Sequence, residues 1–444
     1  MSRKVTSLRV AGLLLTILVA TATTGECDTN MMPDDPNNPG DPGDPGNLAS
    51  SLSVILSGVS MIDGIKAGND LIAMGVTGPG VTGGVQYIKP SQGPDANIIS
   101  NFHTFMTGGF NIAGTWIATR DFNGNVFFYD TATDTFIEVD EDDLALNSGA
   151  TTDKDEFWAE GTHMVTRTDT ARVADGHKLK MIDFSQNPPV ITSFTQDFPD
   201  QQGTTQEVPI IAVDEERMQF VVLQLDIFYL YDMNDPDAAP TTFNTGGDGG
   251  ATNATQPYFD DGYVIYHDRQ GASNGRRVTR MLNVDTGEIT QLSENPSAIW
   301  DVILVNGVFG YFVKETEDDE IDNFISRSVW GTVNGTISYT NTNETDILIV
   351  PPDRETGLVG YGQTMAVTPD LRFRFIAGGG SQGNANYLQV SAGAGFAVIP
   401  TLPEFANVDP NGLEASEVVT SNTICAFKTL FNNQLAYIIL PPAN

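Results

Sequence analysis

The sequence has little of several residue types that often mark a function. Four histidines and two cysteines occur among 444 residues, and none of them stands at zinc-binding spacing from another. Basic residues number 22 against 57 acidic ones, so the formal net charge is −35. Repulsion therefore disfavours nucleic acids and anionic membrane surfaces as partners. Solubility is the simplest reason for the acidic excess.

Local motifs of catalysis are missing as well. The glycine-rich stretch around Ser381 lacks the spacing of a nucleophile elbow, and no Lys-Ser/Thr pair follows it as in a phosphate loop. The four histidines lie singly on or beside predicted strands, where a structural or exposed role is expected: His103, His163, His177 and His267. We therefore expect no catalytic residue, no cofactor-binding residue and no metal site, and no cofactor.

Helical periodicity is absent, and a repeated unit of short strands takes its place. No segment keeps a 3.6-residue apolar period over three turns, so little helix is expected. Residues 112–139 contain three predicted strands joined by polar turns at 121–125 and 130–134. The middle strand, Val126 to Tyr129, has no polar alternation, so both of its faces should be covered. In an antiparallel meander this requires sheets stacked on both sides.

Seven copies of the unit occur along the chain. In each copy an apolar strand ends in a polar turn and is followed by another strand, and these apolar strands end at Lys89, Asp130, Asp183, Asp232, Asn283, Asn334 and Ser391. Successive copies are separated by roughly 40 to 57 residues, which is the size of one β-propeller blade. The sequence therefore predicts an all-β protein, a β-propeller of four-stranded blades.

Strands beyond the seven copies predict how the ring closes. One strand precedes the copies at 51–56, and two follow them at 423–428 and 434–440. A propeller must join its first and last blades, so we expect both chain termini to close it. Residues 434–440 should share a sheet with 51–56 or with 70–76. We favour seven blades, with eight as the alternative if the terminal strands form a blade of their own.

Two repeats resemble a known family. The segments Val367-Thr-Pro-Asp-Leu-Arg-Phe-Arg-Phe and Asp285 to Leu292 resemble the WD40-like repeats of TolB-type bacterial propellers, although Leu371 replaces the usual glycine. Proteins of that type are envelope proteins that act by binding partners. The resemblance therefore implies a bacterial envelope protein with a binding role.

The first 27 residues have the features of an export signal. A basic start is followed by an apolar run from Val10 to Ala22, which is too short for a good membrane span. Cleavage after Ala22 fits an ordinary signal peptide, whereas Cys27 after the apolar run resembles the lipid attachment site of a bacterial lipoprotein. Both alternatives stay open. Any contact with a membrane would come through this N-terminal lipid.

Three regions follow along the chain. Residues 1–27 are the export or lipoprotein signal, residues 28–47 a disordered acidic tether of Pro, Gly and Asp, and residues 48–444 one β-propeller domain. The tether has nothing to bury beyond Met31 and Met32, so it should lack regular structure.

Two acidic loops could in principle hold calcium. Asp121, Asn123 and Asn125 place oxygens at alternate positions, but the later ligands of a calcium loop are missing, so a hairpin turn is expected. The second loop carries Asp318, Asp319, Glu320 and Asp322, and a solvated loop is expected there. Three Asn-x-Thr matches, at Asn253, Asn334 and Asn343, normally mean nothing in bacteria.

These observations favour a binding or scaffold module. We expect an exported or lipid-tethered monomer in the periplasm, the cell envelope or the extracellular space, with a protein or glycan partner. The alternative is a propeller enzyme, a hydrolase, lyase or quinoprotein-like oxidoreductase, with its site in the central funnel. Three or more ionisable side chains that converge at one mouth of the channel would favour the enzyme, and a shallow polar mouth would favour binding.

Overall fold

Strands make up almost all regular structure in the described residues. A computed structural model describes residues 45–443 apart from 61, 79–80, 96, 99–108, 122, 147–156, 199–209, 225–226, 246–256, 269–277, 293–297, 315–323, 334–336, 339–345, 350–363, 380–385, 393–396, 404–405, 407–411 and 430–432. Helix is limited there to α1 (Pro45–Ser51) and the short 3-10 helix η1 (Pro90–Gln92). The expectation of little helix is therefore confirmed for this part of the chain.

The strands pair into eight antiparallel sheets, which we call blades 1 to 8 in ring order. Blade 1 is β2 (Ile62–Gly68), β3 (Leu71–Gly78), β4 (Val81–Ile88) and β5 (Asn97–Ile98). Blade 2 is β6 (Phe110–Ala113), β7 (Trp116–Arg120), β8 (Val126–Asp130) and β9 (Thr135–Glu138). Blade 3 is β10 (Phe157–Glu160), β11 (His163–Arg167), β12 (Leu179–Asp183) and β13 (Val190–Phe194). Blades 4 and 5 are β14 (Ile210–Asp214), β15 (Gln219–Gln224), β16 (Ile227–Asp232) and β17 (Thr241–Asn244); and β18 (Tyr258–Asp260), β19 (Tyr263–Asp268), β20 (Val278–Asn283) and β21 (Ile289–Gln291).

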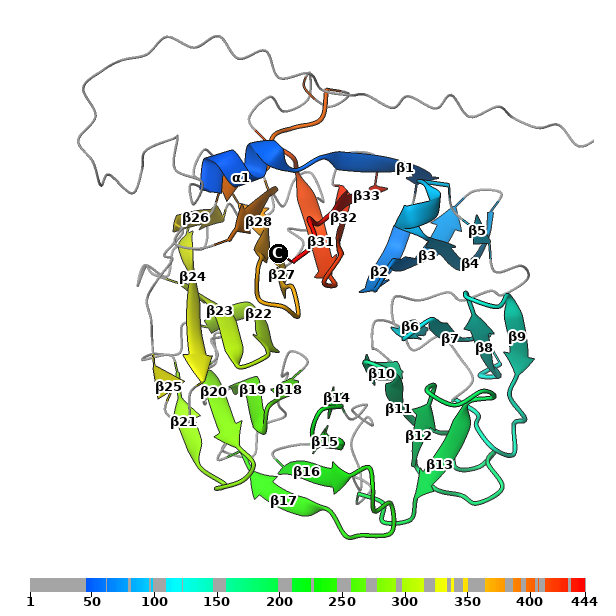
Figure 1. Ribbon diagram of the computed structural model, residues 1–444. Coiled ribbons are helices and arrows are strands. Elements are labelled where there is room, and N and C mark those ends of the chain that lie inside the picture. The colour runs from blue at the N-terminus through cyan, green and yellow to red at the C-terminus, as the bar shows by residue number, and fades with distance from the viewer. Residues whose placement is uncertain are drawn as a thin grey trace, which may run out of the picture. The chain divides into compact units, whose positions relative to one another are not determined.

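The remaining blades include one irregular sheet and the closing blade. Blade 6 is β22 (Ala298–Val305), β23 (Val308–Lys314), β24 (Phe324–Val333) and β25 (Ile337–Ser338), with β26 (Asp346–Ile349) also paired to β24. Blade 7 is β27 (Thr364–Val367), β28 (Arg374–Gly379), β29 (Asn386–Ser391) and β30 (Ala397–Val398). Blade 8 is β31 (Ala415–Thr420), β32 (Ile424–Thr429), β33 (Gln434–Ile439) and β1 (Val54–Ser60). The sheets form a ring around a central axis (Figure 1).

The preference for seven blades is wrong, because the ring has eight. The first repeat forms a complete sheet, β2 to β5, so the terminal strands are not needed to complete it. They instead build blade 8, in which β1 pairs with β33 and Ile55 lies opposite Tyr437. Closure by both chain ends is confirmed, and of the two partners expected for residues 434–440 the strand near 51–56 is the correct one.

The seven repeats found in the sequence all mark the same strand of a blade. Each aligned apolar strand corresponds to the third strand from the ring centre, from β4 in blade 1 to β29 in blade 7. In blade 8 the third strand is β33, and the fourth strand is β1 from the N-terminal region. The pattern of strand, turn and strand along the sequence therefore does not include this blade.

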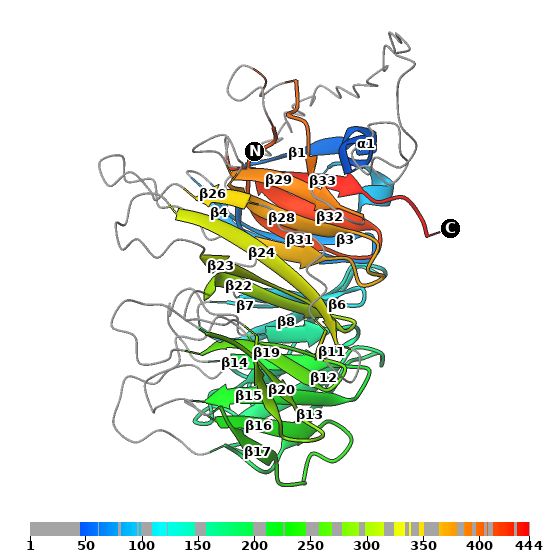
Figure 2. The same cartoon turned by 90° about the vertical axis from the view of Figure 1, so that its left-hand side faces the viewer.

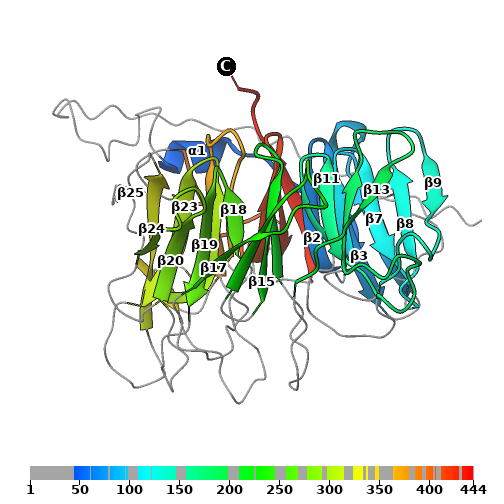
Figure 3. The same cartoon turned by 90° about the horizontal axis from the view of Figure 1, so that it is seen from below.

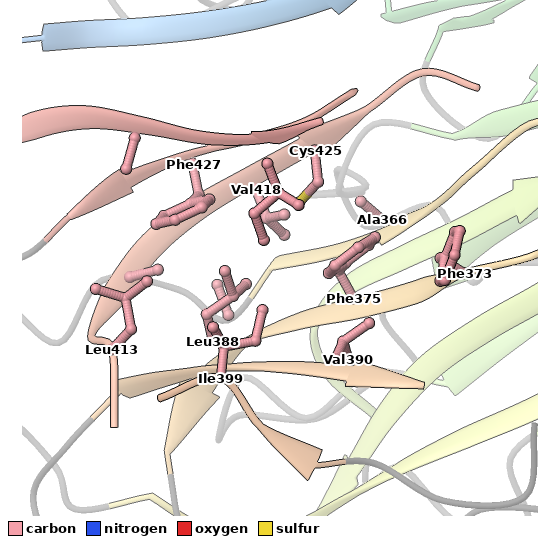
Figure 4. Packing of buried hydrophobic residues seen from close by; sticks show 14 of the residues in the cluster. Ala366, Phe373, Phe375, Leu388, Val390, Ile399, Leu413, Val418, Cys425 and Phe427 are labelled. Carbon is pink, nitrogen blue, oxygen red and sulfur yellow. The ribbon is translucent and has the colours of Figure 1, made fainter. Parts of the chain in front are cut away.

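The core of the propeller is a ring of eight seams between neighbouring blades. Eight clusters of buried apolar side chains occur in the described residues, and each joins two adjacent blades. Figure 4 shows the seam between blades 7 and 8, where Phe375 and Leu388 face Val418 and Phe427. In β8, Phe128 packs in the seam with blade 3 and Tyr129 in the seam with blade 1. Both faces of that strand are buried, as its sequence predicts.

Antiparallel pairing divides the connections between two faces of the ring. We call "turn face" the one that holds the connections from first to second and from third to fourth strand, such as 114–115 and 131–134. The "loop face" holds the connections from second to third strand and from blade to blade, such as 121–125 and 139–156. Side views show the strands running between the two faces (Figures 2 and 3).

The N-terminal part of the propeller begins on the turn face. Val54 lies opposite Ile438 and Ser60 opposite Gln434, so β1 starts at the turn face and ends at the loop face. The preceding helix, α1, includes residues 45–47, which were expected to belong to the tether. Residues 28–44 and the expected signal 1–27, with Cys27, lie outside the described residues.

Candidate functional site

Three carboxylates form a row on the turn face. Glu160, Asp214 and Asp260 are the last residues of β10, β14 and β18, the innermost strands of blades 3, 4 and 5. Each carboxylate accepts a backbone N–H from the first turn of the next blade: Glu160 Oε2 from Glu215 at 2.6 Å, Asp214 Oδ2 from Gly262 at 3.3 Å and Asp260 Oδ2 from Gly307 at 3.1 Å. We call these three residues the carboxylate row. They join four consecutive blades.

Burial makes ionisation of the row unfavourable. The pKa of Glu160 is raised to about 8, mainly because the side chain is buried and further because the carboxylates of Asp214, Asp260 and Glu215 lie near it. The N–H of Glu215 opposes this shift. Burial likewise raises the pKa values of Asp214 and Asp260, against the hydrogen bonds from Gly262 and Gly307. Glu160 can therefore bind or release a proton near neutral pH.

Glu215 holds a second set of contacts across the seam between blades 3 and 4. Its Oε1 atom accepts hydrogen bonds from the N–H and the hydroxyl of Thr162, both at 2.8 Å, and lies 2.6 Å from His163 Nδ1. Burial would raise the pKa of Glu215, but the contacts with His163 and Thr162 outweigh it and the pKa is lowered. Asp183 lies on the other side of the His163 imidazole, with Oδ1 3.7 Å from Nε2. His163 thus stands between two carboxylates.

Gly161 makes the close approach of Glu215 possible. Its φ is +56°, a left-handed conformation that favours glycine. A Cβ atom at this position would lie 1.4 Å from Glu215 Oε2. The seam between blades 4 and 5 has a similar arrangement, in which Arg217 lies against Gly262 and donates two hydrogen bonds to the carboxylate of Asp285, at 3.0 and 2.5 Å.

A different arrangement occupies the loop face of blades 2 and 3. Residues 121–125, 140–146 and 168–178, here called the Arg172 loop cluster, meet around one guanidinium. Arg172 donates to the carbonyl oxygens of Asn123 and Leu146, to Asn125 Oδ1 at 2.6 Å and to Glu141 Oε2 at 3.1 Å. One cation of blade 3 therefore satisfies acceptors from blade 2 and from the connection between the two blades.

The hairpin turn expected at Asp121 is confirmed. Asp121 Oδ1 accepts the N–H groups of Asn123 and Asn125, both at 2.9 Å, as in an Asx turn. The side-chain oxygen of Asn125, which would be a ligand in a calcium loop, accepts a hydrogen bond from Arg172 instead. In the described residues, a protein cation thus takes the place that calcium would need.

A lysine neutralises another carboxylate of the same loop cluster. Asp175 Oδ2 accepts hydrogen bonds from Lys180 Nζ at 2.5 Å and from the hydroxyl of Ser193. Burial acts to raise the pKa of Asp175, but the hydrogen bonds from Lys180 and Ser193 outweigh it and lower the pKa to about 2. The two faces of blade 3 thus hold carboxyl groups of opposite behaviour.

The structure places the remaining predicted residues apart from these sites or outside the described residues. His267 is buried with Nδ1 3.1 Å from the Thr279 hydroxyl, and the backbone N–H of His177 binds Asp175, so both have the structural setting that was expected. Cys425 is a buried thiol in the seam between blades 7 and 8. The following lie outside the described residues: Cys27, His103, Asn253, Asp318, Asp319, Glu320, Asp322, Asn334, Asn343 and Ser381.

The chemistry that these sites offer is limited to ionic contacts and proton binding. Among the described residues, no group of three or more His, Cys, Asp or Glu side chains is arranged to hold a metal ion. No helix in the same part of the chain is long and apolar enough to cross a membrane. The carboxylate row does bring three ionisable groups together, but each carboxylate is engaged with the next blade. The row thus joins blades, and its geometry does not point to a reaction.

Comparisons with known proteins find similar solved structures but no family. No protein-family model matches the sequence, and no curated protein matches it. Solved structures with a similar arrangement include the computationally designed Ika8 protein (11% identity, 88% of this chain and 100% of that chain, TM-score 0.47). BamB from Moraxella catarrhalis is another (12% identity, 88% of this chain and 99% of that chain, TM-score 0.45).

A third similar structure is PorZ, a bacterial surface component of the type-IX secretion system of Porphyromonas gingivalis. It is 11% identical over 88% of this chain and 53% of that chain, with a TM-score of 0.38. Similarity at this level says nothing about what the chain binds. The β-propeller fold, and with it the resemblance to propeller repeats, is established by the strand pairing of the chain itself.

Proposed function

We propose that the protein is an exported β-propeller, tethered through its N-terminal segment, that binds a protein or glycan partner with its loop face. The observation that carries the proposal is the direction of β1, which enters the ring at the turn face. A tether that precedes β1 therefore reaches the propeller on the turn face. The loop face, with its blade-to-blade connections, is then the one turned away from an N-terminal anchor.

The division of connection lengths between the faces supports this choice. On the turn face, first and second strands are joined by two residues in five of the eight blades, as at 114–115 and 161–162. On the loop face, connections such as 139–156 and 399–414 are much longer. Binding residues of a rigid scaffold are found disproportionately on such loops. The Arg172 loop cluster shows that this face can hold long connections in a fixed arrangement.

The carboxylate row bears on the enzyme alternative. Three ionisable groups at one end of the inner strands would suit a catalytic funnel, but all three carboxylates are engaged with the neighbouring blade. A group that holds the ring together is a poor candidate for contact with a substrate. The enzyme alternative therefore rests on this row, and we favour binding because each of its carboxylates already joins two blades.

Site-specific photo-crosslinking tests the proposed face. A photoreactive amino acid is placed at exposed Asn123 on the loop face or at exposed Ala132 on the turn face of the same blade, and the full chain is produced in its native cells. Crosslinked adducts are expected from position 123 and not from position 132. Adducts from position 132 alone would contradict the proposal.

Fractionation tests the anchor separately. Replacing Cys27 by Ser should move the protein from the membrane to the soluble fraction if Cys27 carries a lipid. Unchanged partitioning of the Cys27→Ser variant would instead support cleavage after Ala22. This result does not affect the crosslinking test, so the two parts of the proposal can fail independently.

A further inference from the structure

The segment of residues 45–60, which leads into the ring, packs in both seams of blade 8. Ala49 of α1 is buried in the seam between blades 7 and 8, where Val54 and Leu56 of β1 also pack. Ile55 and Val59 pack in the other seam, between blades 8 and 1. Successive residues of one strand thus contact three blades. Residues 45–60 form a clasp around the joint of the ring, which we call the N-terminal clasp.

Hydrogen bonds fix the β1 part of the clasp. β1 pairs antiparallel with β33 from Val54, opposite Ile438, to Leu56, opposite Ala436, and again at Ser60, opposite Gln434, with an irregularity in the register between Leu56 and Ser60. In the middle of the strand the buried Ser57 donates its hydroxyl to the carbonyl oxygen of Leu435, at 3.1 Å. Figure 1 shows β1 along the outer edge of blade 8, beside β33.

The direction of the strand decides how it would respond to force. β1 starts at the turn face and runs toward the loop face. When its N-terminal end is pulled away from the ring while the loop face is held, the force therefore acts along the strand. Such a pull slides β1 past β33 and loads all their hydrogen bonds at once, because these bonds lie across the strands. A pull directed outward from the ring instead peels the strand and breaks the bonds one after another.

We propose that the N-terminal clasp resists mechanical tension. Tension between the N-terminal tether and a partner on the loop face would act along β1 and shear the β1–β33 pair. The cellular setting rests on the proposed function, since it requires an anchor and a partner at opposite faces. The mechanical property itself belongs to the folded chain. The joint resists tension in the direction in which the tethered protein would be pulled, and yields readily when peeled.

Single-molecule pulling of the full chain tests this property. DNA handles are attached through Asp44→Cys, before α1, and through one of two other positions in a Cys27→Ser background. Asn432→Cys places the second handle next in sequence to Asn433, which precedes β33 at the loop face of blade 8. Asp235→Cys lies in an exposed turn of blade 4, across the ring from blade 8, and gives the outward pull. The buried Cys425 is kept, because its thiol is not accessible.

The force of the first rupture is expected to be several-fold higher with the handle at position 432 than at position 235, at equal loading rate. In both geometries the first event should release the length of residues 45–60. Ser57→Ala should lower the force in the first geometry, whereas Ser53→Ala, at an exposed position just before β1, should leave it unchanged.

Equal forces in the two geometries would overturn the inference, as would a first event that releases another blade. If Cys27 carries no lipid, the fractionation of the Cys27→Ser variant would show it, and the rupture forces would be unaltered. Failure of the proposed function and failure of the mechanical inference are therefore distinguishable.

Discussion

Blades 8 and 3 differ in how they are assembled and in the polar groups at their seams. Blade 8 takes one strand from the start of the chain and three from its end, and apolar side chains fill both of its seams. Hydrogen bonds cross these seams too, such as those that Arg372 of blade 7 donates to the carbonyl oxygens of Asn422 and Pro441. Blade 3 is one continuous segment of the chain, and its apolar seams are supplemented by Glu215 on the turn face and Arg172 on the loop face. The comparison suggests that apolar closure decides whether the ring forms, and that polar contacts adjust its stability and pH response.

The two faces of blade 3 also differ from each other, in the pKa of a carboxyl group. On the loop face Lys180 holds the pKa of Asp175 at about 2, whereas on the turn face burial raises the pKa of Glu160 to about 8. Hydrogen bonds reach both carboxyl groups. The deeper burial of Glu160 and the cation beside Asp175 together make the difference between a carboxyl group that keeps its proton and a carboxylate that stays charged.

Deletion of residues 423–444 should have the largest effect and should abolish cooperative folding. The deletion removes β32 and β33 and leaves β1 without a partner. Burial is lost for Ile424, Phe427, Leu435, Tyr437 and Ile438, at about 1.5 to 3 kcal/mol each against a typical stability of about 5 to 15 kcal/mol. Ile439 is 50% exposed and adds little.

Thermal unfolding followed by circular dichroism checks this prediction. A protein lacking only residues 442–444 is the control and should melt like the full chain. A sharp transition near the full-length temperature in the 423–444 deletion would show that blade 8 is dispensable, and the contrast with blade 3 would fail.

Alanine at three glycines of blades 2 and 3 should give graded losses. Gly124→Ala places a Cβ 2.0 Å from the Leu146 carbonyl oxygen at φ +83°, and backbone cannot easily move aside, so a loss of about 3 kcal/mol is expected. Gly161→Ala meets the mobile carboxylate of Glu215 and should cost about 2 kcal/mol. Gly176→Ala at φ +70° has no atom within 4 Å and should cost about 1 kcal/mol. Denaturant unfolding measures all three, and a reversed order would contradict the packing described at both faces.

Arg172→Met should destabilise the loop face of blade 3. The variant keeps most of the unbranched stem of the side chain but leaves four acceptor groups without their shared donor, for an expected loss of about 2 kcal/mol. Arg172→Lys keeps the charge without the planar fork and should lose less. Denaturant unfolding gives both values. Equal stability of wild type and the Met variant would mean that Arg172 does not hold these loops together.

Glu160→Gln should change how stability depends on pH at the turn face. The folded pKa of about 8 lies above the usual glutamate pKa of about 4.5, so the folded state holds the proton more tightly. This contribution is fully present below about pH 4.5 and is lost as the pH rises to about 8. Wild type should lose on the order of 1 to 2 kcal/mol across that window, since one pKa unit corresponds to about 1.4 kcal/mol and the seam can relax.

In Glu160→Gln that part of the pH dependence should disappear, because the amide oxygen can still accept the N–H of Glu215 without ionising. Glu138→Gln, on the exposed outer strand of blade 2, removes the same charge and is the matched control. Identical pH profiles for the two variants, measured by denaturant unfolding from pH 4.5 to 9, would remove the role assigned to Glu160.

The sequence predicts the propeller well because the signal is local. An apolar third strand with both faces buried, such as Val126–Asp130, differs from its surroundings and recurs seven times. The eighth blade was only the second choice, because its fourth strand, β1, lies at the other end of the chain. No pattern of neighbouring residues reports a sheet assembled from both termini.

The sites were missed for a related reason. Arg172 meets Asn125 only because blades 2 and 3 lie side by side, and nothing near either residue in the sequence announces the contact. The carboxylate row did leave a signal. Glu160, Asp214 and Asp260 each end a first strand just before a tight turn, so aligning the repeats on their first strands would have brought them into one column.

Closure of the eighth blade by β1 can be measured directly with paired cysteines. Leu56 lies opposite Ala436 in the β1–β33 pair, so Leu56→Cys with Ala436→Cys, in a Cys27→Ser background, should form a disulfide on mild oxidation of the folded protein. Ala73 of β3 lies in blade 1 and packs in its seam with blade 2, so Ala73→Cys with Ala436→Cys should remain reduced. A disulfide in the second pair and none in the first would contradict an eight-bladed ring closed by the N-terminal strand.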